Sequence, residues 1–271
     1  MTVGIGAACE SFQNVILAAD VRGSYSTPRL GPNDEMGKQF SLPLGLYADI
    51  AGYFSHCESL IAFLTHYMEE LKKQPEVLLG HIRDAIWLAQ AQELRFRFNT
   101  ALRNNLGMDL EEWKKSTNAR ILRSGRALMR STEVMVELIV GGFTPDSAVL
   151  LSTAYKDPPE IVSSHVTVGS GWKRALVALD KRKQNPHYSC QRTILHIAEA
   201  LKAAKIERTV GPPADYIILQ RGAVRRFKAR DPFVSELITK YKGRDSAELD
   251  NDDDAREKIK SLMYEQNMFT P

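Results

Sequence analysis

The amino-acid sequence predicts an α+β fold in which two β-sheets pack face to face and helices cover the outside, a four-layer αββα sandwich. Short strand-like stretches come in sets, and the gaps between the sets each hold two or more predicted helices. A doubly wound parallel sheet would instead alternate single strands with single helices. The expected strand sets cover residues 2–52, 133–168 and 216–228.

The first set predicts two strand pairs. Residues 2–8 and 14–19 are short, apolar and rich in β-forming side chains, and residues 10–13 between them are typical of a hairpin turn. A second pair covers residues 38–52 and turns at the Pro-Leu-Gly of residues 43–45. Residues 21–33 are rich in Gly, Pro, Ser and Arg, so we expect a loop there.

Helical periodicity follows at residues 55–73, where Ser55 is the expected N-cap and Glu58 stands at capping-box spacing. Pro75 predicts the start of a second helix that runs to about residue 104. We expect a helical insertion over about residues 75–130. Its basic end, residues 120–130, is interpreted as a solvated face rather than a binding surface.

The later elements are predicted by apolar runs and turn residues. A helix is expected directly after Gly171. The other expected elements are strands at residues 133–142, 147–154, 160–168, 216–220 and 224–228, and a helix at 188–205.

Residues 1–230 are predicted to form the main domain, and residues 231–271 a charged helical C-terminal tail. The acidic run at residues 250–254 is interpreted as a solvated tail or linker. It is a poor match to a calcium loop, because Ala255 replaces the required turn glycine and Ser261 the bidentate glutamate.

Composition excludes several function classes. The 271 residues are 44% hydrophobic and 25% charged, and a net charge of +3 favours neither nucleic-acid nor membrane partners. Three widely separated cysteines favour a reducing compartment, so we expect a cytoplasmic protein. We see no signal peptide, and no apolar run has the roughly 18 residues of a membrane span. The absence of nucleotide and metal motifs predicts a protein without cofactors.

Thr2 directly follows the initiator methionine, and removal of Met1 would free its α-amine. With a pKa of roughly 7.7–8.0, such an amine can act as the base for its own side chain.

Asp20 ends the second expected strand, Lys38 opens the next pair, and Gly52 closes it. A Val-Gly-Ser-Gly stretch that contains Ser170 comes late, between a strand and a helix. Together these motifs resemble the proteasome β-subunit family of N-terminal-nucleophile (Ntn) hydrolases over roughly residues 2–222.

The resemblance implies a role for each of these residues. Thr2 would be the nucleophile, Asp20 would orient Lys38, and Lys38 would favour the alkoxide by its positive charge. The Gly52 N–H would form the oxyanion hole, and Ser170 would help to hold the water of the proton relay.

The resemblance also implies substrate contacts. Ser24 and Gly52 would pair with an extended substrate backbone, and Ile50 and Phe54 would line the first specificity pocket. The usual second Asp and Ser of the family are replaced, with Glu207 nearest the Asp position and Val210 nearest the Ser position. The Val-Gly-Pro-Pro-Ala-Asp turn at residues 210–215 is similar to that of the bacterial proteasome-related Anbu proteins.

These observations predict a threonine-type peptidase that acts on peptides or unfolded proteins. By the same resemblance it would self-assemble into a homo-oligomer, either a ring or a spiral. The sequence does not indicate which unfoldase, if any, would be its partner. Two alternatives stay open: a non-catalytic structural subunit of the same fold, and an Ntn amidohydrolase for a small amide.

Overall fold

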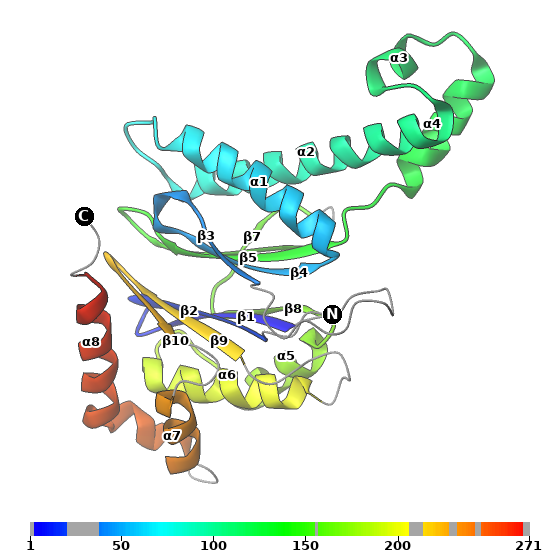
Figure 1. Cartoon of the computed structure of the whole chain (residues 1–271). Helices are drawn as coiled ribbons and strands as arrows, with labels where there is room; N and C mark the ends of the chain where they lie inside the picture. The colour runs from blue at the N-terminus through cyan, green and yellow to red at the C-terminus, as the bar shows by residue number, and fades with distance from the viewer. Residues whose placement is uncertain are drawn as a thin grey trace.

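The computed structural model describes residues 3–20, 38–154, 157–205, 214–227, 232–241 and 245–267. Two five-stranded antiparallel sheets stack face to face, and helices cover the outer face of each (Figure 1). The predicted αββα sandwich is therefore confirmed. None of the described helices is both long and apolar enough to cross a membrane.

The first sheet is built around the N-terminal hairpin. Its strand order is β10–β9–β2–β1–β8. The hairpin turns at residues 10–13, as predicted, and Glu10, Ser11 and Phe12 all adopt positive φ. The strands are β1 (Val3–Cys9), β2 (Asn14–Asp20), β8 (His165–Gly169), β9 (Ala214–Gln220) and β10 (Ala223–Phe227).

The second sheet has the order β3–β4–β5–β6–β7. The predicted turn at residues 43–45 is a short 3-10 turn between β3 and β4. Side chains of this sheet alternate between the helix layer and the first sheet. The strands are β3 (Gln39–Ser41), β4 (Tyr47–Gly52), β5 (Val136–Phe143), β6 (Ala148–Ala154) and β7 (Glu160–Ile161).

The single strand predicted at residues 160–168 is wrong, because the chain crosses from one sheet to the other within it. The Val162 N–H donates to Leu150 O of β6, at 2.9 Å. Ser164 O then accepts the Ala8 N–H of β1, at 2.8 Å. A continuous β-type pattern carries no signal for such a change of partner, so the local sequence could not reveal it.

Helices α1 (Phe54–Leu71) and α2 (Leu79–Leu106) cover the second sheet (Figure 1). Two predictions about their starts are wrong. Tyr53 is the N-cap of α1 and makes no side-chain cap, while Ser55 lies inside the first turn, where its carbonyl accepts the Ser59 hydroxyl. Pro75 lies before α2, in the segment that connects the two helices.

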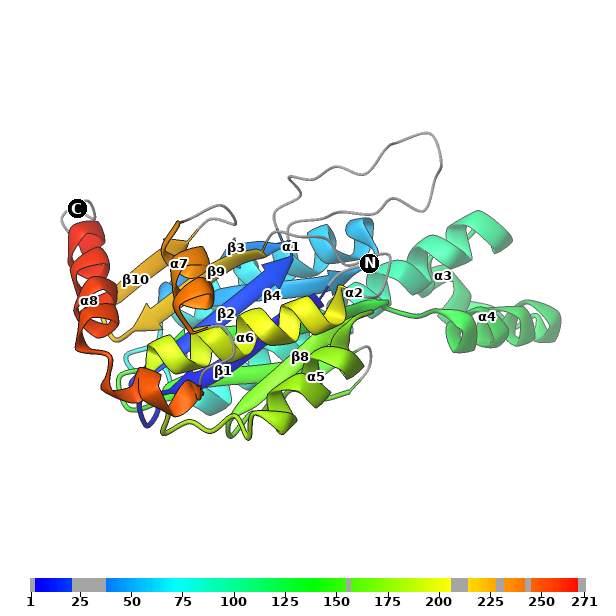
Figure 2. The same cartoon turned by 90° about the horizontal axis from the view of Figure 1, so that it is seen from below.

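The far end of α2 continues into an arm that extends away from the sandwich (Figures 1 and 2). The arm contains α3 (Leu110–Lys115) and α4 (Ala119–Ser131). Asp109 caps α3 in a capping box with Glu112. Gly125 of α4 lies directly against the Trp113 ring, where a Cβ would come 2.0 Å from Nε1.

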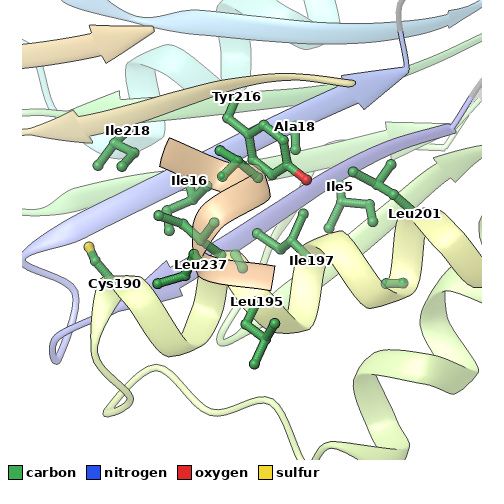
Figure 3. Close-up of a cluster of buried hydrophobic side chains, with 14 of the residues drawn as sticks. Ile5, Ile16, Ala18, Cys190, Leu195, Ile197, Leu201, Tyr216, Ile218 and Leu237 are labelled. Atoms are coloured by element: carbon green, nitrogen blue, oxygen red, sulfur yellow. The ribbon is translucent and has the colours of Figure 1, made fainter. Parts of the chain in front are cut away.

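Helices α5 (Trp172–Lys181) and α6 (Cys190–Ala204) cover the first sheet. Buried side chains of α6 face β1, β2 and β9 in one apolar cluster (Figure 3). Burying a side chain such as Ile or Leu stabilises a fold by about 1.5–3 kcal/mol, so this cluster is a major part of the stability. A separate apolar cluster fills the space between the sheets, with Leu17, Ile139, Leu150 and Ile217 among its members.

The C-terminal segment packs against α6 through apolar residues such as Phe233, Leu237 and Leu249. The interpretation of residues 250–254 as a solvated tail is wrong for at least one member. Asp250 accepts from the Ser189 N–H at 3.1 Å and pairs with Arg192 at 2.6 Å. The segment comprises α7 (Pro232–Lys240), the 3-10 helix η2 (Ser246–Asn251) and α8 (Asp253–Asn267).

Candidate active site

Strand ends from both sheets converge at one end of the sandwich. In the first sheet, Val3 at the start of β1 pairs with Gly169 at the end of β8. In the second sheet, Gly52 at the end of β4 pairs with Val136 at the start of β5. Asp20 ends β2 beside the start of β1. Residues that are far apart in the chain therefore meet at this end because the strands pair antiparallel.

Asp20 binds two neighbouring groups at this end of the sandwich. Its Oδ1 accepts the backbone N–H of Val3 at 2.8 Å and the Lys38 ammonium at 2.9 Å. The side chains of Asp20 and Lys38 are only 1% and 11% exposed. The backbone of Lys38 is fixed to β4, because the Lys38 carbonyl accepts the Ile50 N–H at 3.0 Å. The structure thus brings Asp20 and Lys38 together, as the sequence predicts.

The environment of Lys38 favours loss of its proton. Burial lowers the pKa of Lys38, and the neighbouring carboxylate of Asp20 only partly offsets this effect. Lys38 is therefore less basic than an exposed lysine.

Gly52 occupies a position that only glycine can fill. Its φ is +150°, and a Cβ there would lie 2.1 Å from the Met135 carbonyl oxygen. Close by in sequence, Phe54 begins α1 and is 48% exposed, whereas Ile50 is 5% exposed and belongs to the apolar cluster under α1 and α2. Of the two side chains expected to line a pocket, Phe54 is thus the more accessible.

Ser170 lies in the turn between β8 and α5 and is exposed. The preceding residue, Gly169, donates its N–H to the carboxylate of Glu137 in β5. This bond joins the two sheets at the candidate site. Sequence reasoning missed Glu137, although a signal exists: it is a lone acidic residue in an apolar strand, on the face that looks toward the first sheet.

A second residue that sequence reasoning missed is Asp49, in the middle of β4. It is fully buried between the sheets. Burial raises the pKa of Asp49 to about 8, and the Gln39 amide and Lys38 charge oppose this only in part. The sequence signal is again an acidic residue inside an apolar run.

Three predicted site residues, Thr2, Ser24 and Glu207, lie outside the described residues. Val3, next to Thr2, is described, and its N–H is the group that Asp20 binds. No cluster of His, Cys, Asp or Glu within the described ranges is suited to hold a metal ion.

Comparison with known structures agrees with this architecture. A structure of the Gly-1 mutant of Anbu from Hyphomicrobium sp. strain MC1 superposes with a TM-score of 0.61 at 13% sequence identity. The match covers 89% of this chain and 93% of the Anbu chain. The chain has the proteasome-like fold of Anbu. No protein-family model and no curated protein sequence matches the chain.

The Anbu-like fold agrees with the resemblance noted in the sequence. Because identity is only 13%, the similarity concerns the fold and not the chemistry of individual side chains.

Proposed function

We propose that the chain is a threonine-type hydrolase that cleaves peptide bonds with Thr2 as its nucleophile. The observation that supports it best is the bonding of Asp20 to both Lys38 and the Val3 N–H. This arrangement ties a buried lysine to the residue that follows Thr2. A nucleophile that is the second residue of the chain needs such an anchor to be held in a fixed position.

In the proposed reaction, the α-amine of Thr2 takes the proton of the Thr2 hydroxyl after Met1 has been removed. The hydroxyl oxygen attacks the substrate carbonyl, and the amine of the substrate leaves with a proton. Water, activated by the same α-amine, then hydrolyses the resulting ester. The positive charge of Lys38 favours the alkoxide, and the Gly52 N–H binds the oxyanion.

The remaining site residues have supporting roles in this proposal. Ser170 helps to hold the relay water, Ser24 and Gly52 bind the substrate backbone, and Phe54, the exposed member of the Ile50–Phe54 pair, contacts the first substrate side chain. Glu207 stands in for the second acidic residue of related sites. Self-association into a ring or spiral and a cytoplasmic location belong to the same proposal; the free, buried cysteines are compatible with a reducing compartment.

The test compares Thr2→Ala with Thr2→Ser in the full chain on fluorogenic peptides. Both replacements are small enough to permit removal of Met1, which intact mass verifies. We expect Thr2→Ala to abolish turnover and Thr2→Ser, which keeps a hydroxyl, to retain part of it. Full activity in Thr2→Ala would rule out the proposal.

Other outcomes separate the alternatives. A processed wild-type chain that cleaves small amides but no peptide would identify an amidohydrolase. A chain that keeps Met1 quantitatively and cleaves neither class would identify a structural subunit.

A further inference from the structure

Asp49 lies on the face of β4 that looks toward the first sheet, directly under β1. A Cβ placed on Gly4 of β1 would be 3.5 Å from Asp49 Cβ and 3.8 Å from its Oδ2. The carboxyl group is thus covered by backbone rather than by solvent. Neither of its oxygens has a hydrogen-bond partner of normal geometry among the described residues.

Such a site strongly disfavours a carboxylate. The Gln39 amide gives the carboxylate only weak support, and a buried charge with so little hydrogen bonding is costly, so the group favours its protonated form. Across the β3–β4 pair, Asp49 stands opposite Gln39, and in β5 it stands opposite the apolar Ile139. The neutral acid is therefore the form that this position accepts at neutral pH.

Backbone pairing brings Asp49 close to Lys38. Gln39, the residue after Lys38, stands opposite Asp49, and the Lys38 carbonyl accepts the N–H of Ile50, the residue after Asp49. The titratable groups around Asp49 act on it in opposite directions. Lys38 favours its ionised form and Asp215 of β9 opposes it. Lys38 in turn is influenced by Asp20, Asp49 and the Cys57 thiol of α1. Burial raises the pKa of Cys57 to about 12, so this thiol stays neutral and adds no charge.

We propose that Asp49 is a positioning residue for Lys38: as a neutral acid it adds no second negative charge beside Lys38. This inference rests on the proposed function, because it concerns the charge that Lys38 presents to Thr2. When Asp49 loses its proton, the new carboxylate offsets the positive charge of Lys38. The alkoxide then loses support, and turnover falls on the alkaline side.

The first experiment measures kcat/KM for peptide cleavage from pH 6 to 10 in the wild type and in Asp49→Asn, an isosteric side chain that cannot ionise. We expect the ratio of the rate at pH 9 to that at pH 7 to be about tenfold higher in Asp49→Asn. An identical alkaline decline in the two proteins would overturn the proposal.

The second experiment needs no activity. The folded state keeps Asp49 protonated up to about pH 8, whereas the unfolded chain releases this proton near pH 4. The stability that Asp49 contributes is thus complete below pH 4 and is lost as the pH rises to about 8. The melting temperature of Asp49→Asn minus that of the wild type should therefore increase between pH 4 and pH 8 and then level off. A flat difference would show that Asp49 is ionised in the fold and would overturn the proposal.

The third experiment tests the link to Lys38. Because the Lys38 charge favours the carboxylate form of Asp49, the Lys38→Met background should move the upper end of this pH window above pH 8. Lys38→Gln serves if Lys38→Met does not fold. If the upper end of this pH range is the same in both backgrounds, Asp49 does not act on Lys38. An inactive wild type with both stability effects present would defeat the proposed hydrolase while leaving the Asp49–Lys38 coupling intact.

Discussion

The Lys38 ammonium lies 2.9 Å from Asp20 Oδ1, in a pair of which almost nothing is exposed. The same oxygen accepts the Val3 N–H, so one carboxylate serves both a side chain and the first described residue of β1. Removing either charge would deprive the other of this buried counter-charge, which is far more costly than removing an exposed pair. The hairpin and the lysine are therefore coupled in stability.

Asp20→Ala should destabilise the fold by about 3–5 kcal/mol, because Lys38 and the Val3 N–H both lose their acceptor. Asp20→Asn is the matched control: its amide oxygen can still accept both bonds, so its loss of stability should be clearly smaller. Urea denaturation of the two variants measures the difference. Equal stability of Asp20→Ala and the wild type would contradict this account of the pair.

Gly52→Ala should destabilise the fold by about 4 kcal/mol or more and abolish any activity, because its Cβ would overlap the Met135 carbonyl. Gly45→Ala is the control. Gly45 also has positive φ, +69°, but a Cβ there meets nothing within 4 Å. Gly45→Ala should lower the stability of the fold by only about 1–2 kcal/mol, because only the left-handed backbone disfavours alanine there. Thermal unfolding of both variants tests the comparison, and similar losses would show that the contact at Gly52 is unimportant.

Glu137→Ala should weaken the turn that carries Ser170, because the Gly169 N–H loses its acceptor. We expect a loss of about 1–3 kcal/mol in stability and reduced turnover at saturating peptide. Glu137→Gln keeps an oxygen acceptor and should retain most of both properties. Hydrogen exchange at the Gly169 amide reports the bond directly, and unchanged exchange in Glu137→Ala would argue against it.

His196 should make the C-terminal segment sensitive to acid. Its ring is buried in α6, with Nδ1 2.7 Å from Gln184 Oε1 and Nε2 3.0 Å from the Ser246 hydroxyl. Burial and the nearby Arg192 and Arg182 lower its pKa to about 4, so the fold holds the neutral ring.

The sign of the pH effect follows from this shift. The unfolded chain binds a proton near pH 6.5 and the folded chain only near pH 4. The stability gained from neutral His196 is complete above pH 6.5 and falls by about 1.4 kcal/mol per pH unit toward pH 4. Urea denaturation should show this slope in the wild type and lose it in His196→Gln. A slope that persists unchanged in the variant would assign the acid sensitivity to other groups.

Much of the fold could be predicted because short-range sequence patterns indicate the strand hairpins and the amphipathic helices, as in residues 2–19 and in α6. Local patterns gave wrong predictions where a tertiary contact determines where an element begins or which sheet a strand joins. The chain leaves β7 for β8 within one β-type stretch because the partners of Val162 and Ser164 belong to different sheets. The start of α1 at Phe54 and the docking of Asp250 on Arg192 are decided in the same way.

At the candidate site, the resemblance to the proteasome β-subunit family was enough to predict that Asp20 pairs with Lys38. Glu137 and Asp49 became apparent from the stacking of the two sheets. An acidic residue in an apolar strand has no evident role until the opposite sheet is in place. The covering of Asp49 by Gly4, and the bond from Gly169 to Glu137, exist only because two sheets from distant parts of the chain stack face to face. Burial and charge proximity depend on that stacking, and no local pattern encodes them.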